Sequence, residues 1–108
     1  MRPFSIAVFG LALAASGSAS ALVADATQGE KIARRWCAAC HLVAPDQKEA
    51  SADVAPFAAA ARHKTNAELA DFLTDPHPKM PNMMLSREEI ADLVAYMRSL
   101  APEGPKGP

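Results

Sequence analysis

The chain has 108 residues, half of them hydrophobic, and a formal net charge of −1 at neutral pH. This length suits one small domain. There is no basic stripe and no interleaving of basic with aromatic residues, which argues against a nucleic-acid partner. The chain also has no internal repeat and no convincing strand pattern, so we expect an all-α fold.

The N-terminal segment has the layout of a secretory signal peptide. Arg2 supplies a positive start, an apolar run follows from Phe4 to Ala15, and small residues end in the pattern Ala19-Ser20-Ala21. The apolar run is shorter than the ~20 residues that a transmembrane helix needs. We therefore expect residues 1–21 to be removed on export, leaving no stable membrane insertion. A second pattern ends at Ala26, so cleavage is expected near Ala21 or Ala26.

The remaining chain predicts one domain over residues 27–100, followed by a flexible tail over residues 101–108. Thr or Ser followed three residues later by Glu is a capping box, which marks the start of a helix. The pattern occurs at Thr27, Thr65 and Ser86, and Pro56 opens a further short helix. The segment 75–82 contains three prolines and is expected to be a loop. The tail is rich in Pro and Gly, which indicates fraying.

Helical spacing also predicts which residues are buried. In the first helix the expected buried face contains Ile32, Ala33, Trp36 and Cys40. The third helix is expected to bury Leu69, Phe72 and Leu73, and the last one Ile90, Leu93, Val94 and Met97.

The motif Cys37-Ala38-Ala39-Cys40-His41 is typical of covalent c-type haem attachment. On a helical turn, both sulfurs lie on one side and can each form a thioether with a haem vinyl group. His41 follows at once and offers a ring nitrogen as the proximal iron ligand. A thioredoxin-like redox pair would need a βαβ context, and a zinc site would need two more paired ligands. A disulfide closing so small a loop would contribute little.

The function of the haem depends on the distal iron ligand, opposite His41. The candidates are Met80, Met83, Met84, Met97, His63 and His77. Met80 lies in the proline-bounded loop, where a stiff backbone can hold a thioether at a fixed distance from iron. A neutral, soft sulfur favours the ferrous state. We expect Met80 to be the distal ligand, with Met97 as core filling, His63 at a helix end and His77 as the main competitor.

Together these features resemble the small monohaem class I cytochromes c of bacterial periplasms. The resemblance runs from about Gln28 to Leu100 and is carried by the following elements: Gly29, Trp36 to His41, Pro56-Phe57, Pro76 to Asn82, and Leu85-Ser86 to Tyr96. It implies a class I cytochrome c-like fold with about three main helices around one covalently bound haem c. It also implies Met80 as distal ligand and a periplasmic location.

The resemblance further implies that the first and last helices cross near Gly29, with Leu93 and Tyr96 packed there. The aromatic residue that relatives often carry four positions after this glycine is replaced by Ala33, so a looser crossing is expected, with Trp36 partly compensating. A carbonyl near Pro56 is expected to accept the second ring N–H of His41.

The partners of the haem propionates stay open, with Arg62, Trp36 and Lys79 as candidates. Two interpretations of Lys31, Lys48, Lys64 and Lys79 stay open: a rim at the haem edge that steers acidic partners, or a solvated surface of mixed charge.

The leading functional hypothesis is an electron carrier that passes single electrons between redox protein partners and is not itself an enzyme. It would act as a monomer or in transient complexes. Two alternatives stay open: a haem-containing subunit of a periplasmic redox enzyme, and a ligand-binding or sensing haem protein with a labile sixth ligand.

Overall fold

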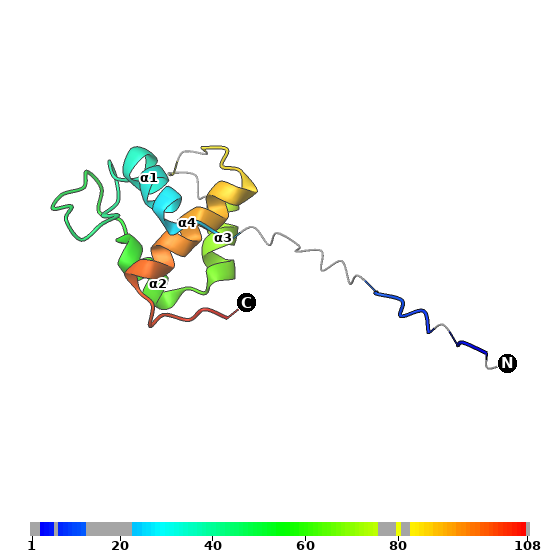
Figure 1. Ribbon diagram of the computed structural model, residues 1–108. Helices are drawn as coiled ribbons and strands as arrows, with labels where there is room; N and C mark the ends of the chain where they lie inside the picture. Colours follow the sequence, from blue (N-terminus) through cyan, green and yellow to red (C-terminus); the bar gives the residue numbers. More distant parts are fainter. Residues whose placement is uncertain (1–2, 6, 13–22, 76–79, 81–82, 108) are drawn as a thin grey trace.

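The computed structural model describes residues 3–5, 7–12, 23–75, 80 and 83–107. The helices in this part of the chain are α1 (Ala26–Trp36), α2 (Phe57–His63), α3 (Asn66–Thr74) and α4 (Arg87–Leu100). No strand occurs among the described residues. The all-α prediction is therefore confirmed, with three longer helices and the short α2 that was expected after Pro56 (Figure 1).

Helix α1 begins slightly earlier than the sequence pattern predicts. Its N-cap is Asp25, whose side chain accepts hydrogen bonds from the backbone N–H groups of Thr27 and Gln28. The expected cap, Thr27, lies inside the helix. The backbone N–H of Asp25 also donates to the Asp92 carboxylate at 2.7 Å, which ties the start of α1 to α4. An Asp at this position accepts from the free N–H groups of the first turn, as Thr27 was expected to do.

The caps of the two later helices are confirmed. The Thr65 side chain accepts from the backbone N–H of Glu68 at the start of α3. At the start of α4, Ser86 and Glu89 form the complete reciprocal capping box.

The centre of the fold is the crossing of α1 over α4 (Figure 1). A methyl group on Gly29 would lie 2.0 Å from the backbone oxygen of Asp92 and 2.8 Å from Cβ of Tyr96, so only glycine fits. Ala33, one turn later, is completely buried. Two small residues at this spacing let the helix backbones approach closely. The crossing is therefore close at Gly29, with small residues rather than an aromatic one on the α1 side.

Trp36 does not compensate for the missing aromatic residue, because its side chain is 54% exposed. The Arg35 guanidinium lies 4.8 Å from the centre of its ring. The buried face of α1 instead runs through Gly29 and Ala33 to Cys37, at intervals of four residues. On α4 the predicted core residues Leu93, Val94 and Met97 are buried, as is Tyr96. The Tyr96 hydroxyl donates to the Val43 carbonyl at 2.6 Å, and its burial raises the tyrosine pKa.

Arg98 is buried within this core and makes five hydrogen bonds. It donates to the side-chain oxygen of Asn66 and to the carbonyls of Ala61, Lys64, Ala101 and Pro105. A guanidinium has five N–H donors, so these acceptors use its donor capacity. The side chain thereby connects the end of α2, the start of α3 and the segment after α4.

The first residues after α4 are held more closely than the flexible tail predicted from composition. Ala101 and Gly104 are buried, and a methyl group on Gly104 would lie 2.1 Å from the Ala61 oxygen. Glu103 forms an ion pair with Arg62 at 3.3 Å. Pro and Gly end the helix here, but the buried Arg98 fixes the chain that follows it.

At the other terminus, residues 3–5 and 7–12 form no helix and extend away from the helical body (Figure 1). Phe4 and Phe9 are almost fully exposed. The first expected cleavage pattern, Ala19 to Ala21, lies outside the described residues. No helix among the described residues is long and apolar enough to cross a membrane.

Candidate functional site

The residues from Cys37 to His41 continue directly from α1 as a series of tight turns. The backbone N–H of Cys37 donates to the Ala33 carbonyl at 2.9 Å, and that of His41 donates to the Cys37 carbonyl at 2.9 Å. Cys37 is buried, whereas Cys40 is exposed, and neither forms a disulfide. Burial disfavours the thiolate and, with a smaller contribution from Cys40, raises the pKa of the free Cys37 thiol to about 11.

Two side chains that the sequence did not single out hold this turn in place. The Gln47 amide donates to the carbonyls of Ala38 and His41, both at 2.8 Å, and its oxygen accepts from the backbone N–H of Val43 at 2.9 Å. Ser51 donates from its hydroxyl and its backbone N–H to the Ala39 carbonyl at 2.7 and 2.9 Å. Neither residue belongs to a recognisable motif, and no periodic signal marks the loop that carries them.

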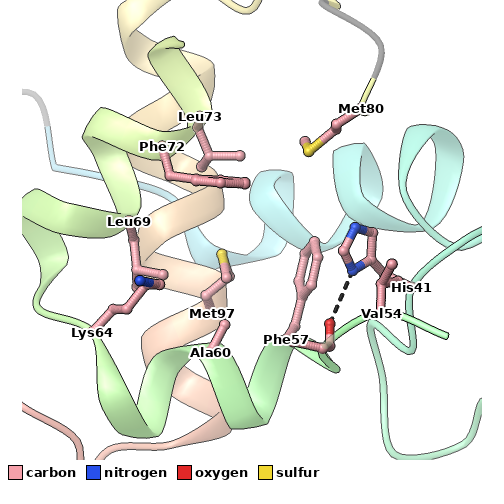
Figure 2. Close-up of a pocket in the computed structure, with 11 residues that line it drawn as sticks. His41, Val54, Phe57, Ala60, Lys64, Leu69, Phe72, Leu73, Met80 and Met97 are labelled. Carbon is pink, nitrogen blue, oxygen red and sulfur yellow. Dashed lines mark hydrogen bonds between the residues drawn. The ribbon is translucent and has the colours of Figure 1, made fainter. Parts of the chain in front are cut away.

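His41 has the orientation that the sequence predicts. Its Nδ1 lies 2.9 Å from the Ala55 carbonyl, the residue before Pro56. This confirms the expected hydrogen bond to a carbonyl near Pro56. The imidazole also lies against Phe57, with 5.4 Å between the ring centroids. In Figure 2 the other ring nitrogen points away from Ala55, toward the side of the cavity where Met80 lies. Fixing one ring nitrogen in this way orients the other for a metal.

A cavity of about 250 Å³ adjoins His41. Its wall is contributed by α2, α3, α4, the loop before α2 and Met80, and it is almost entirely apolar. The lining residues are His41, Val54, Ala55, Phe57, Ala60, Lys64, Leu69, Phe72, Leu73, Met80 and Met97. Figure 2 shows the Met80 side chain and a ring nitrogen of His41 facing each other, with Phe72 and Leu73 projecting from α3 on the opposite side of the cavity from His41.

The structure divides the candidate distal iron ligands into those that line the cavity and those that do not. Met80 and Met97 line the cavity, and Met97, which is buried, also fills the core as expected. Met84 is 87% exposed and has a positive φ of 51°, and Met83 packs against the core. His63 ends α2, as predicted, and is exposed. His77 lies outside the described residues.

The expected propionate partners do not line the cavity in the described part of the chain. Arg62 is paired with Glu103, Trp36 contacts Arg35, and Lys79 lies outside the described residues. Lys64, by contrast, lines the cavity.

This donor set fits a haem. A flat apolar ring needs an apolar slot, and its iron needs an imidazole whose orientation is fixed. No group of three or more His, Cys, Asp or Glu side chains suited to a bare metal ion occurs among the described residues. The apolar lining of the cavity suits an apolar ring, and His41 offers a ring nitrogen to its iron.

Comparison with known proteins agrees with this geometry. Residues 24–97 match the family model described as cytochrome c oxidase, cbb3-type, subunit III. Cytochrome c-552 of Bradyrhizobium diazoefficiens is 56% identical over 90 residues, which cover 82% of this chain and 86% of the relative. No solved structure matches the chain. The protein belongs to the cytochrome c family: it is a small monohaem cytochrome c with an all-α class I fold and one covalently bound haem c.

Proposed function

We propose that this protein carries single electrons between redox proteins outside the cytoplasm, with the haem iron held between His41 and Met80. The observation that carries the proposal is the placement of these two side chains on facing walls of one apolar cavity (Figure 2). The name of the relative, cytochrome c-552, supports an electron-transfer role.

We assign the two covalent links of the haem to Cys37 and Cys40. Both precede His41 in one tight turn, and that turn is fixed from α1 by backbone hydrogen bonds. Each thiol would add across one haem vinyl group, and the sulfur–carbon bond would keep the ring against the end of α1. Gln47 and Ser51 would preserve the shape of the turn when the ring is attached.

Ligation by His41 and Met80 suits a carrier better than an enzyme. The haem iron supplies a one-electron couple when bound, and its axial ligands set the potential. With His41 and Met80 both holding the iron, the site would change little on reduction. The Ala55 carbonyl orients His41, and the apolar wall around it excludes water. Ligands held in fixed positions would therefore lower the reorganisation energy of each electron transfer.

Export is the second part of the proposal. We infer that residues 1–21 are a signal peptide and that the mature chain retains Asp25. Cleavage after Ala26 would remove the residue that caps α1 and also contacts Asp92. Cleavage near Ala21 leaves both contacts intact, so the structure of α1 favours the earlier of the two patterns. A periplasmic location and transient contacts with redox protein partners follow from this assignment.

The test uses the purified holoprotein. The carrier proposal predicts a reversible one-electron wave in protein-film voltammetry, and a reduced form that does not bind carbon monoxide. Met80→Ala should open the sixth position and allow carbon monoxide to bind, whereas Met84→Ala, which changes an exposed methionine, should not. Rapid carbon monoxide binding by the reduced wild type would instead favour the ligand-binding alternative.

A further inference from the structure

Among the described residues that line the apolar cavity, Lys64 is the one with a permanent charge, and it is exposed at the rim of the cavity. Figure 2 shows Lys64 on the wall away from His41, beside Leu69. A haem is apolar over most of its surface but ends in two propionate carboxylates. A carboxylate that is partly removed from water needs a hydrogen-bonding or charged partner. Lys64 thus offers one cation to a haem, whose two propionate carboxylates need partners.

The backbone of Lys64 is fixed at this place. Its N–H donates to the Ala60 carbonyl at the end of α2, and its own carbonyl accepts from Nη2 of Arg98 at 2.7 Å. The side chain, in contrast, makes no ion pair or hydrogen bond with another described residue. A positioned backbone with an uncommitted ammonium group is suited to hold a ligand carboxylate.

Three arginines in the described part of the chain are already engaged with protein acceptors. Arg98 uses its five donors on protein acceptors. Arg62 pairs with Glu103, and Arg34 pairs with Glu30 and Asp46. None of these three arginines lines the cavity. Lys64 is the cation that remains there.

The surroundings of Lys64 strengthen the argument. A second, more open hollow also includes Lys64, and its other lining residues are Glu68, Asp71, Phe72, Thr74 and Asp75. Three carboxylates in that hollow would repel an incoming anion, so a haem carboxylate at this end of the cavity needs a positive charge between itself and α3. Lys64 lines both spaces and occupies that intermediate position.

The positions of the substituents on the haem ring also place the carboxylates near Lys64. The vinyl groups and the propionates of a haem lie on opposite sides of the ring. If the vinyl side is attached at Cys37 and Cys40, beside His41, the carboxylates point toward the wall away from that turn. This step rests on the proposed attachment sites. We propose that Lys64 forms the ion pair that anchors a haem propionate in this protein.

The ion pair has a predictable effect on the iron. An ionised propionate stabilises the ferric state, and a lysine that compensates its charge favours the ferrous state. Lys64→Met should therefore lower the reduction potential, Lys64→Arg should largely preserve it, and Lys106→Met, in the exposed tail, should change it far less. The change must occur in holoprotein whose mass and visible spectrum show unaltered haem attachment.

A second readout is specific to the carboxylates. Redox-difference infrared spectra of protein carrying haem labelled with carbon-13 in its propionates should show a shifted carboxylate band in Lys64→Met, but not in Lys106→Met. An unchanged band, together with a potential that moves no further than in the tail control, overturns the proposal. A shift in Lys79→Met but not in Lys64→Met also overturns it. Loss of covalent haem in Cys37→Ser or Cys40→Ser tests the attachment sites separately.

Discussion

The α1–α4 crossing and the cavity side of the molecule are built in different ways. At the crossing, protein atoms alone fill the space: Gly29 admits the Asp92 backbone, and Ala33 and Leu93 are completely buried. On the other side, apolar side chains of α2 and α3 surround a cavity, and Phe72 is still 39% exposed. One half is closed by the chain, whereas the other retains an apolar cavity that we propose is closed by the haem.

This difference explains how so small a chain forms a stable domain. Chains of this size bury a limited fraction of their surface and often need a cofactor. In the proposed arrangement the haem would complete the apolar core on the cavity side. The crossing sets the position of Cys37 and His41, and the haem would in turn give α2 and α3 a surface to pack on.

The largest effect is expected when the covalent links are removed. Cys37→Ser/Cys40→Ser leaves the cavity side without the group that closes it, so the apoprotein should lose most of its helical circular dichroism. Wild-type holoprotein expressed in the same way provides the control. A native-like helical spectrum in the apoprotein would show that the crossing alone supports the fold, and would refute the proposed dependence on haem.

Disruption of the crossing should be the next largest effect. In Gly29→Ala the added methyl would meet the Asp92 oxygen at 2.0 Å, and backbone atoms cannot move aside as a flexible side chain does. We expect the free energy of unfolding to fall by about 3 kcal/mol. Gly107→Ala, with no atom within 4 Å of the new methyl, is the matched control and should change little in chemical denaturation.

Arg98 links the two regions, and its loss should affect both. Arg98→Met removes donors from the carbonyls of Ala61 and Lys64, which are buried or partly buried. Because these acceptors would be left without hydrogen-bond partners, we expect the free energy of unfolding to fall by about 3 kcal/mol. Arg62→Met, which breaks only a surface ion pair, should cost under about 1 kcal/mol. Equal losses in the two variants would contradict a structural role for the buried arginine.

The cap of α1 should contribute less. Asp25→Ala removes the acceptor for two backbone N–H groups of the first turn, which typically costs about 1 kcal/mol. Thr27→Ala should cost less, because Thr27 lies inside the helix rather than at its cap. Thermal unfolding of the two holoproteins would compare them directly. A larger loss of thermal stability in Thr27→Ala than in Asp25→Ala would show that Thr27 caps the helix, as the sequence predicted.

The smallest expected effect concerns the surface of α1. A hydrogen bond from Arg34 is the main cause that lowers the pKa of Asp46, and Coulomb attraction adds to it. Because the folded-state pKa is lowered, the pair stabilises the fold above the usual Asp pKa and ceases to do so as the pH falls through the folded-state value. Asp46→Asn should therefore be slightly less stable than wild type at neutral pH and equal to it in acid. A difference that persists in acid would exclude this electrostatic origin.

The sequence predicted the helices and the bound haem c because both depend on short-range signals. The boxes at Thr65 and Ser86 mark the starts of α3 and α4, and the periodic positions of α4 become its buried face. The motif from Cys37 to His41 is likewise a local pattern, whereas the carbonyl partner of His41, 14 residues away, was expected only from the family resemblance.

Features that depend on three-dimensional proximity could not be predicted. Trp36 was expected to be buried on helical spacing, but α1 turns its small residues toward α4, and Trp36 remains outside. Gln47 binds carbonyls up to nine residues earlier, and Arg98 binds groups 32 to 37 residues earlier. No local pattern indicates such contacts. The role of Lys64 likewise appears only when α2 and the cavity are seen together.

The central claim is that iron is held between His41 and Met80. The ferric protein should show the far-red absorption band that reports methionine–iron ligation. Met80→Ala should abolish the band, whereas Met97→Ala, which removes the other thioether lining the cavity, should retain it. Persistence of the band in Met80→Ala, or its loss only in Met97→Ala, would contradict the assignment.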